Sequence, residues 1–577
     1  MDTEEQSLNA LVLFNSASPT CREDGERVRM YIEHFGLPAD PLDLLHEPLP
    51  TSLSRYPIVI LAHPRLDPTG RRLGGIGLST LQDALRAGTG MLSFDPDLSY
   101  ALLGQPVGEL HRFSEVEISS TGHTVTARHA PGQSFSLAQD VLAPSAPGEP
   151  LLVAGGYAFL SAARENEGRL VTWASPAWAD TRVLGPMSGL DDLLWRGLVW
   201  AARKPFCLRG LPPLVTMRVD DVVGSGTLWD ESPLYWVEES ARLGWKPWLG
   251  LFIYNNSPET VHQLQSFTAR GQATIFPHAF GRPNRGAEDS FFYYEDALPL
   301  RADEYDEFIF FDHQHGVPWS DHEAMRGLHA VDRWFAAHAP LPMSSVVLPH
   351  WYEMGSNTAL HVFEKWNCDI VASMNDVDMP LAPDVQWLPL GPFRRIDPPG
   401  ECFPFTPGQR AGRPIYYADF VNLGGCRFFN SLTEIRRDHP FGFEWEPNND
   451  VAGTTARAVA HIRRALDSMA MATLFTHETD YLCKISPENW RIIMEAVTRE
   501  LAPYNPRMVT LDEGACIQRA TRTARLTHVS RARSGEFTAR FSTPAECPTT
   551  MYCFDTDSLD GHLIDVPAFS EEVRFTL

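Results

Sequence analysis

Two adjacent carboxylates end an apolar segment of this sequence and offer its clearest opportunity for acid–base or metal chemistry. The segment 214–219 is apolar and β-branched and leads directly into Asp220 and Asp221. Because side chains alternate along a strand, two neighbouring residues at its end can have different roles in one site. One carboxylate can bind a metal while the other accepts a proton from water. A helix N-cap or an Asx-turn after a strand would instead give the pair a structural role.

Histidines follow several later segments that have the composition of β-strands. A lone histidine is more often an ordinary core or surface residue than a ligand, so the repetition carries the argument. The carboxyl ends of parallel strands meet on one face of a barrel, where such side chains are expected to converge. The segments and their ends are 273–277 before His278, 308–311 before Asp312, His313 and His315, 346–349 before His350, and 472–476 before His477.

The elements that must position these residues alternate between strand and helix. We predict an α/β protein in which 206–510 forms a distorted (β/α) barrel of about seven repeats, with an insertion at 381–449. Residues 1–205 contain continuous apolar strands with helical crossovers, which are typical of a parallel sheet covered on both faces. Residues 511–577 carry β signals and predict a small β-sandwich.

Length and composition are those of a multidomain globular protein. The chain has 577 residues, of which 44% are apolar and 21% charged, so several hydrophobic cores are expected. The net charge of −25 argues against nucleic acid or an anionic membrane surface as the main partner. No apolar run is long enough to predict a membrane span.

The beginning of the chain and its cysteines bear on the compartment. The acidic, polar start has no secretory pattern, which predicts a cytoplasmic protein, although a secreted protein with a trimmed leader would look the same. The nine cysteines are scattered, and their odd number and the lack of a CxxC pair indicate reduced thiols. Nothing in the sequence indicates the oligomeric state.

The order of the acidic and histidine residues resembles the polysaccharide deacetylase superfamily, the carbohydrate esterases with a NodB-homology domain. The strand ending in Asp-Asp matches the first motif of this family. The resemblance implies that Asp220 is the general base and Asp221 a metal ligand. A late strand ending in Leu-x-His matches 474–477 with one extra residue, which implies that His477 is the general acid.

The middle motif of the family is only partly present. It supplies two metal-binding histidines one helical turn apart, and His278 matches the first. Arg282 occupies the position of the second. We therefore expect His313 or His315, from the next strand end, to complete the metal site, in preference to His350.

The N-terminal part resembles the class I glutamine amidotransferase-like, flavodoxin-like domains that accompany carbohydrate-active enzymes. The strand that would carry the family's nucleophilic cysteine ends in Ser93 and Phe94 instead. Cys21 lies in the loop after the first strand and is interpreted as an ordinary thiol. An accessory role is expected for this domain. The whole arrangement resembles bacterial and fungal deacetylases of exopolysaccharides that contain hexosamine.

The chemistry implied is hydrolysis of an amide. Aspartate and two histidines suit Zn²⁺, although they also suit other divalent metals. Arg218 is expected near Asp220, either to hold it ionised or to bind substrate. Asp312 or Glu478 is expected to orient a histidine. Aromatic residues near the strand ends are candidates for stacking on sugar rings: Trp229, Tyr254, Trp319, Trp351 and Tyr352.

Three functional hypotheses follow from these observations. The first is a metal-dependent deacetylase of an N-acetylated amino sugar in a polymer, an oligomer or a small glycoside. The second keeps the fold and the metal but hydrolyses an amide that is not a sugar. The third is a carbohydrate-binding protein without catalysis, which the missing histidine partner of His278 favours.

Overall fold

A computed structural model describes most of the chain in two compact units. Unit 1 comprises Met1–Pro212 and Ala520–Leu577, and unit 2 comprises Pro213–Arg519. The structure describes residues 6–178, 190–224, 232–281, 308–312, 318–350, 354, 356–366, 368, 370–371, 416–417, 430–434, 437–439, 442–444, 450–478 and 482–577.

Unit 1 is built on a mixed sheet whose strand order is β3-β2-β4-β5-β10-β9-β8-β6-β7. The first five strands in this order are parallel to one another, and the rest are antiparallel. The strands are β2 (Ala10–Phe14), β3 (Ala39–Asp43), β4 (Ile58–Leu61), β5 (Gly90–Ser93), β6 (Leu110–Ile118), β7 (Ser134–Pro144), β8 (Glu149–Ala154), β9 (Tyr157–Glu165) and β10 (Gly168–Trp173). The helices are α1 (Glu26–His34), α2 (Gly74–Arg86), α3 (Pro96–Leu102) and α4 (Asp191–Ala201).

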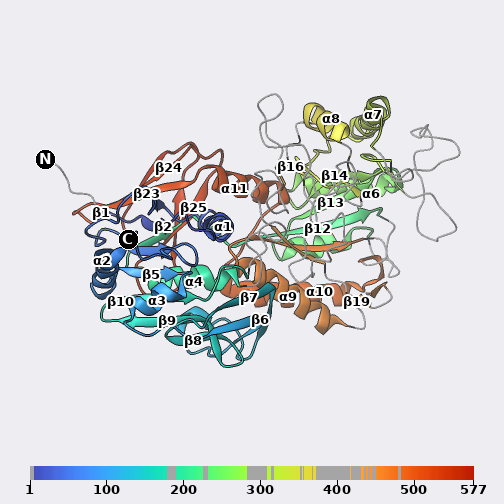
Figure 1. The fold of residues 1–577 in the computed structure, drawn as a ribbon. Helices are drawn as coiled ribbons and strands as arrows, with labels where there is room; N and C mark the ends of the chain where they lie inside the picture. The colour runs from blue at the N-terminus through green and yellow to red at the C-terminus, as the bar shows by residue number, and fades with distance from the viewer. Residues whose placement is uncertain are drawn as a thin grey trace. The chain divides into compact units, whose positions relative to one another are not determined.

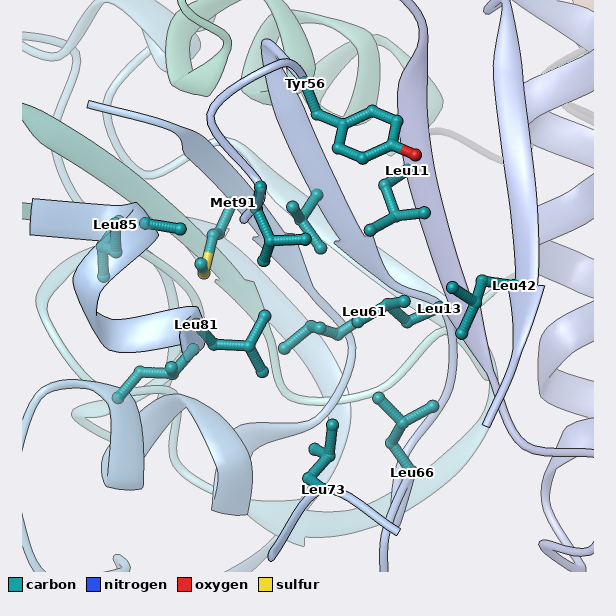
Figure 2. Packing of buried hydrophobic residues seen from close by; sticks show 14 of the residues in the cluster. Leu11, Leu13, Leu42, Tyr56, Leu61, Leu66, Leu73, Leu81, Leu85 and Met91 are labelled. Carbon is teal, nitrogen blue, oxygen red and sulfur yellow. The ribbon is translucent and has the colours of Figure 1, made fainter. Parts of the chain in front are cut away.

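The parallel half of this sheet has an apolar core. Leu11, Leu13 and Leu61 of the strands belong to the same buried cluster as Leu81 and Leu85 of α2, as Figure 2 shows. The strands β2 and β4 are apolar throughout, because both faces of a parallel sheet are covered. The sequence pattern therefore identified these strands correctly.

The two ends of the chain contribute to two small antiparallel sheets in unit 1. Their orders are β1-β23-β24-β27 and β11-β25-β26. Residues of both sheets, including Val529 and Met551, share one buried apolar cluster. The strands are β1 (Gln6–Ser7), β11 (Phe206–Leu208), β23 (Leu526–Arg531), β24 (Phe537–Phe541), β25 (Thr549–Phe554), β26 (His562–Val566) and β27 (Glu572–Phe575).

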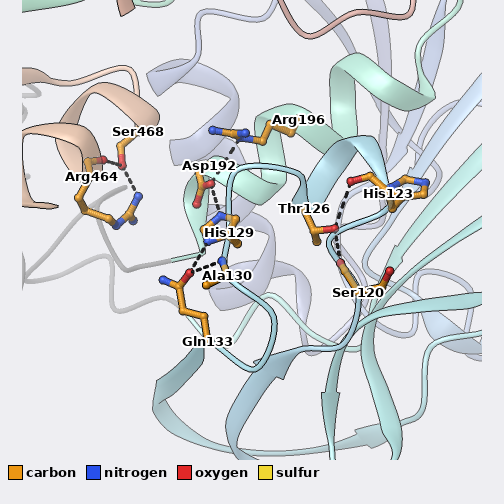
Figure 3. Close-up of polar contacts among 10 residues, drawn as sticks. All are labelled: Ser120, His123, Thr126, His129, Ala130, Gln133, Asp192, Arg196, Arg464 and Ser468. Atoms are coloured by element: carbon orange, nitrogen blue, oxygen red, sulfur yellow. Dashed lines mark hydrogen bonds and ion pairs between the residues drawn. The ribbon is translucent and has the colours of Figure 1, made fainter. Parts of the chain in front are cut away.

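A polar cluster joins the β-rich part of unit 1 to α4. His129 lies between two partners, with Nε2 2.6 Å from Asp192 and Nδ1 3.1 Å from Gln133 (Figure 3). Asp192 also lies 3.4 Å from Nε of Arg196 one helical turn later. Because Asp192 is fully buried, these partners supply the charge compensation that a buried carboxylate requires.

Unit 2 contains a parallel sheet of order β14-β13-β12-β21-β18, and β22 pairs with the beginning of β12. Figure 1 labels β12, β13 and β14 along this sheet. The strands are β12 (Leu214–Val222), β13 (Pro247–Phe252), β14 (Thr274–Ala279), β18 (Asn430–Glu434), β21 (Met471–His477) and β22 (Arg507–Met508). The helices are α5 (Tyr235–Arg242), α6 (Pro258–Ala269), α7 (Asp321–Ala337), α8 (Ser356–Trp366), α9 (Val451–Asp467), α10 (Pro487–Leu501) and α11 (Leu511–Thr523), whose last residues belong to unit 1.

The remaining short strands of unit 2 lie outside this sheet. The parallel strands β15 (Val346–Val347), β16 (Ile370–Val371) and β17 (Tyr416–Tyr417) form a second sheet. The antiparallel pair β19 (Arg437–His439) and β20 (Gly442–Glu444) forms a third.

The structure confirms a mixed α/β protein, but the strands that it describes do not close into a barrel. They form an open sheet and the separate sheet of β15, β16 and β17. The strand β18 lies within the range predicted as an insertion, yet it pairs with β21 as part of the main sheet. The segment predicted as a strand before Asp312 is irregular over 308–311. No helix in the described part of the chain is long and apolar enough to span a bilayer.

Candidate metal centre

The site begins near the end of β12, at two buried aspartates, the second of which departs from regular strand geometry. Asp220 is 2% exposed and Asp221 is 6% exposed. Asp221 has a φ of +55°, which is uncommon outside glycine but tolerated best by aspartate and asparagine. The pairing of β12 with β13 shifts register between Val219 and Val222. This local turn redirects the Asp221 side chain, which an ideal strand would send to the face opposite Asp220.

Three side chains from separate segments of unit 2 form a buried cluster with metal-binding geometry. Each of Asp221, His278 and His350 offers one ligand atom, and these atoms lie within 4.8 Å of one another. Nδ1 of His350 is 3.2 Å from Oδ1 of Asp221, and Nε2 of His278 is 3.5 Å from the same oxygen. The two imidazole rings are nearly perpendicular, at 84°.

The hydrogen bonding of His278 prepares one nitrogen as a ligand. Nδ1 lies 2.6 Å from the carbonyl oxygen of Leu348. Since a carbonyl oxygen only accepts, Nδ1 carries the hydrogen, and the lone pair of the neutral ring is on Nε2, which faces the two aspartates. Burial lowers the pKa of His278 to about 4. The ring is therefore neutral near pH 7, as a metal ligand must be.

His350 reaches the cluster because its segment lies along the edge strand β14. The backbone N–H of Ser344 donates to the carbonyl of Ile275 at 2.7 Å, and Ile275 also forms an isolated parallel bridge with Met343. The ring of His350 lies 5.1 Å from that of Phe252 and 5.0 Å from that of Phe308. These aromatic neighbours make one side of the cluster apolar, which strengthens its electrostatic interactions.

Asp220 is held by Arg218 from the same strand. Nε of Arg218 donates to Oδ1 of Asp220 at 2.8 Å, and Nη2 pairs with Oδ2. The guanidinium lies 4.3 Å from the ring centre of Phe475 and is fully buried. Burial alone would raise the pKa of Asp220, but Arg218 and the nearby histidines hold it below its usual value. Asp220 is therefore a fixed carboxylate, with Oδ2 3.7 Å from Nε2 of His278.

His477 lies beside Asp220 on the neighbouring strand. The two residues are partners in the parallel register of β12 and β21, so their side chains project to the same side of the sheet. Its charge contributes to lowering the pKa of both aspartates, against the opposing effect of burial. His477 is also more exposed than the aspartates. The His477 side chain is therefore partly exposed and lies on the same side of the sheet as that of Asp220.

Glu478 supports the turn that follows the aspartates. Its Oε2 accepts hydrogen bonds from the backbone N–H groups of Val223 at 2.6 Å and Gly224 at 2.9 Å. Its own N–H donates to the carbonyl of Asp220 at 2.9 Å. Gly224 has a φ of +61°, and a Cβ there would lie 2.3 Å from Thr260. This bonding fixes the chain on both sides of Asp221. Burial raises the pKa of Glu478 to about 7.

The cluster includes three of the residues that the sequence singled out at strand ends. It contains Asp221 and His278, which were both expected to be ligands. The third member is His350, which was expected to be a less favourable ligand than His313 or His315. His313 and His315 lie outside the described residues. The signal for His350 was present, since an apolar strand segment ends at this histidine as at His278.

The residues that were expected to contact substrate differ in how far they are buried. Arg218 has no exposed surface with which to meet a substrate, so its ion pair favours the expectation that it holds Asp220 ionised. Trp319 is half-buried before α7, and its stacking role stays a prediction. Tyr254 is buried against Phe280, with ring centres 5.4 Å apart, and belongs to the core. Trp229, Trp351 and Tyr352 lie outside the described residues.

Two other candidates named from the sequence are not among the three residues of the cluster. Asp312 is buried, and its expected role in orienting a histidine stays a prediction. Burial raises the pKa of the Cys21 thiol, which fits an unactivated cysteine.

The donor set fits a divalent transition metal. One carboxylate oxygen and two imidazole nitrogens are the three protein ligands typical of a catalytic zinc site, which leaves at least one position open. The same set also serves iron and other first-row metals. The neutral His278 and the aspartate with a lowered pKa are both in the protonation state that metal binding requires. The cluster therefore is able to hold a metal ion, and its geometry leaves the identity of that ion open.

Comparison with known proteins adds no functional assignment. No protein-family model and no curated protein matches the chain. A cytoplasmic protein of Salmonella typhimurium is 16% identical, over 34% of this chain and 100% of its own, with a TM-score of 0.24. A ThuA-like protein of Parabacteroides merdae is 13% identical over 34% and 90%, also with a TM-score of 0.24. A beta-galactosidase of Bacillus circulans is 14% identical over 30% and 29%, with a TM-score of 0.21. These scores are too low to support an inference.

Proposed function

We propose that this protein is a metal-dependent amide hydrolase that removes the acetyl group from an N-acetylated amino sugar. The observation that carries the proposal is the buried cluster of Asp221, His278 and His350, with Asp220 beside it and His477 on the adjacent strand. A bound divalent metal would act as a Lewis acid on the amide carbonyl and would lower the pKa of water. Zn²⁺ is the ion that we expect.

The other steps belong to side chains of the protein. Asp220 accepts a proton from the attacking water, and the bidentate contact with Arg218 keeps its carboxylate in a fixed orientation. His477 donates a proton to the nitrogen of the leaving amine. Asp220 and His477 are register partners on adjacent strands. The base and the acid therefore lie next to each other at the carboxyl ends of these strands.

The substrate class rests on the resemblance to carbohydrate deacetylases, in which the order of Asp220, Asp221, His278 and His477 is the common element. The parallel strands β3-β2-β4-β5-β10 of unit 1 follow the flavodoxin-like order. This order supports the proposed accessory domain. An amide that is not a sugar would use the same cluster, so the substrate panel must include both classes.

The decisive experiment measures metal content and amide hydrolysis in parallel. Purified protein, loaded with zinc and then dialysed, is analysed by mass spectrometry for metal. Release of free amine is followed with N-acetylglucosamine and N-acetylgalactosamine oligomers and with acyclic N-acetyl amides. We expect about one zinc per chain and turnover of the amino-sugar substrates.

Single variants separate binding from chemistry. Asp221→Ala, His278→Ala and His350→Ala are expected to lose metal and activity together. Asp220→Asn is expected to keep the metal and lose activity. His322→Ala, in an exposed histidine of α7, is the matched control and is expected to keep both. Wild-type protein that binds no zinc would overturn the proposal, and zinc binding with turnover of the acyclic amides alone would move it to the second substrate class.

A further inference from the structure

A cavity of about 610 Å³ lies within unit 1, and none of its lining residues belongs to the proposed chemistry. Its walls come from the loop and helix after β2, from β2 and β3, and from the segment 521–527. All of these segments belong to unit 1. The volume is within the range of pockets that enclose small organic molecules.

The cavity combines apolar side chains with an excess of cationic ones. Its apolar residues include Val12, Phe14, Val28, Ile32 and Leu526. Five arginines contribute to its wall, against only two acidic residues. The arginines are Arg22, Arg29, Arg209, Arg522 and Arg525, and the acids are Glu26 and Glu33. This local excess of positive charge stands out in a chain with a net charge of −25.

The two glutamates are already engaged by one of the arginines. Nε of Arg29 donates to Glu26 at 2.8 Å, and its Nη1 pairs with Glu33. Nη1 of Arg525 lies 3.8 Å from Oε1 of Glu33, the oxygen that also pairs with Arg29. The side chain of Arg525 is 60% exposed. Since two carboxylates face five guanidinium groups, the wall retains cationic charge that can attract an anion.

Arg209 adds a buried cation to this wall. It is 1% exposed, and its Nη2 donates to the hydroxyl of Thr549 at 2.8 Å. Its guanidinium lies 4.3 Å from the ring centre of Phe541. Nε and Nη1 have no hydrogen-bond partner in the described part of the chain. A buried charge without a counter-ion is costly, and an anion held in the adjacent cavity would offset part of that cost.

We propose that this cavity binds a small organic anion, in which a carboxylate or phosphate group is attached to an apolar body. The arginines recognise the acidic group, because guanidinium forms strong charge-assisted hydrogen bonds with both kinds of oxyanion. The apolar residues of the wall accommodate the remainder of the ligand. The site is independent of the metal cluster, since all of its residues lie in unit 1.

Isothermal titration calorimetry of the full chain tests this proposal with three probes that share one apolar body. The probes are 1-naphthoate, 1-naphthyl phosphate and the neutral 1-naphthamide. We expect one binding site for at least one of the anions and an affinity at least about 10-fold weaker for the amide, as the loss of a charged hydrogen bond implies. The stronger of the two anions identifies the preferred acidic group. Equal binding of acid and amide, or no binding of either anion, would overturn the proposal.

Charge-matched variants locate the binding. Arg22→Ala and Arg525→Ala each remove one cation from the wall of the cavity. Each is expected to weaken anion binding about 3- to 10-fold. Arg112→Ala, in an arginine of β6 with 72% side-chain exposure, removes the same charge outside the cavity and is expected to leave affinity unchanged. Ile32→Trp fills the cavity without changing charge and is expected to abolish binding. His278→Ala should bind the anion like wild type. An equal effect of Arg112→Ala and Arg525→Ala would contradict a specific site.

Discussion

Asp220 and Asp221 direct consecutive carboxylates at the same atom, with oxygens 3.7 Å and 3.5 Å from Nε2 of His278. In a regular strand, neighbouring side chains face opposite sides. The positive φ of Asp221 and the register shift beside it remove this alternation. A candidate base and a candidate metal ligand are thereby brought together by one local distortion of the backbone.

The first prediction concerns the buried ion pair of Arg218 and Asp220. Arg218→Met leaves the Asp220 carboxylate buried without its cation, and we expect a loss of about 3–5 kcal/mol in the free energy of unfolding. Urea denaturation followed by fluorescence measures this loss. The double variant Arg218→Met with Asp220→Leu removes both charges and is expected to recover most of it. A double variant that is less stable than Arg218→Met would contradict the assigned role of the pair.

The second prediction concerns stabilisation by a metal. Zinc at about 100 times its dissociation constant should stabilise the folded state by about 2.7 kcal/mol. We therefore expect Tm to rise by several degrees on addition of zinc and to fall on addition of a chelator, as measured by scanning fluorimetry. His350→Ala should show no response, whereas His322→Ala should respond like wild type. A rise in Tm of the same size in His350→Ala would place zinc elsewhere.

The third prediction concerns the support that Glu478 gives to the turn after Asp221. Glu478→Ala leaves the buried N–H of Val223 and that of Gly224 without their acceptor. We expect a cost of about 2–6 kcal/mol in stability, since each of the two lost partners costs about 1–3 kcal/mol, and weaker zinc binding. Glu478→Gln keeps an acceptor oxygen and should cost less than about 1 kcal/mol. Equal losses in the two variants would show that the backbone contacts do not matter.

The fourth prediction concerns the pH dependence of unit 1. Burial alone would lower the pKa of His129, but the Asp192 carboxylate raises it above its usual value of 6.5. A raised pKa means that the folded state binds the proton more tightly. The ion pair of His129 and Asp192 therefore stabilises the folded state fully below pH 6.5. This stabilisation is lost as the pH rises through the pKa of His129 in the folded state.

Comparison of wild type with His129→Gln isolates this effect. We expect the difference in unfolding free energy to shrink as pH rises above 6.5, as measured by urea denaturation at each pH. A difference for His129→Gln that is independent of pH would contradict the assigned ion pair.

The sequence predicted the alternating α/β architecture and most of the parallel strands, because continuous apolar segments such as 58–61 have few other stable arrangements. It also located Asp220, Asp221, His278 and His477 at strand ends. It did not predict that β18 joins the main sheet, since long-range strand pairing leaves little trace in local composition. For the same reason, the sheet remains open over the described strands where a barrel was expected.

The order of residues along the chain is enough to place acidic and histidine side chains at the ends of predicted strands, and hence to indicate acid–base and metal chemistry. Which of these side chains meet depends on how the strands pack. His350 joins Asp221 because the segment before it pairs with Ile275, a contact between residues far apart in the chain. Arg209 likewise becomes a buried cation only because it packs against Phe541 and Thr549, which belong to the second chain segment of unit 1. Spacing along a chain fixes local geometry, whereas charge and burial depend on neighbours that only folding supplies.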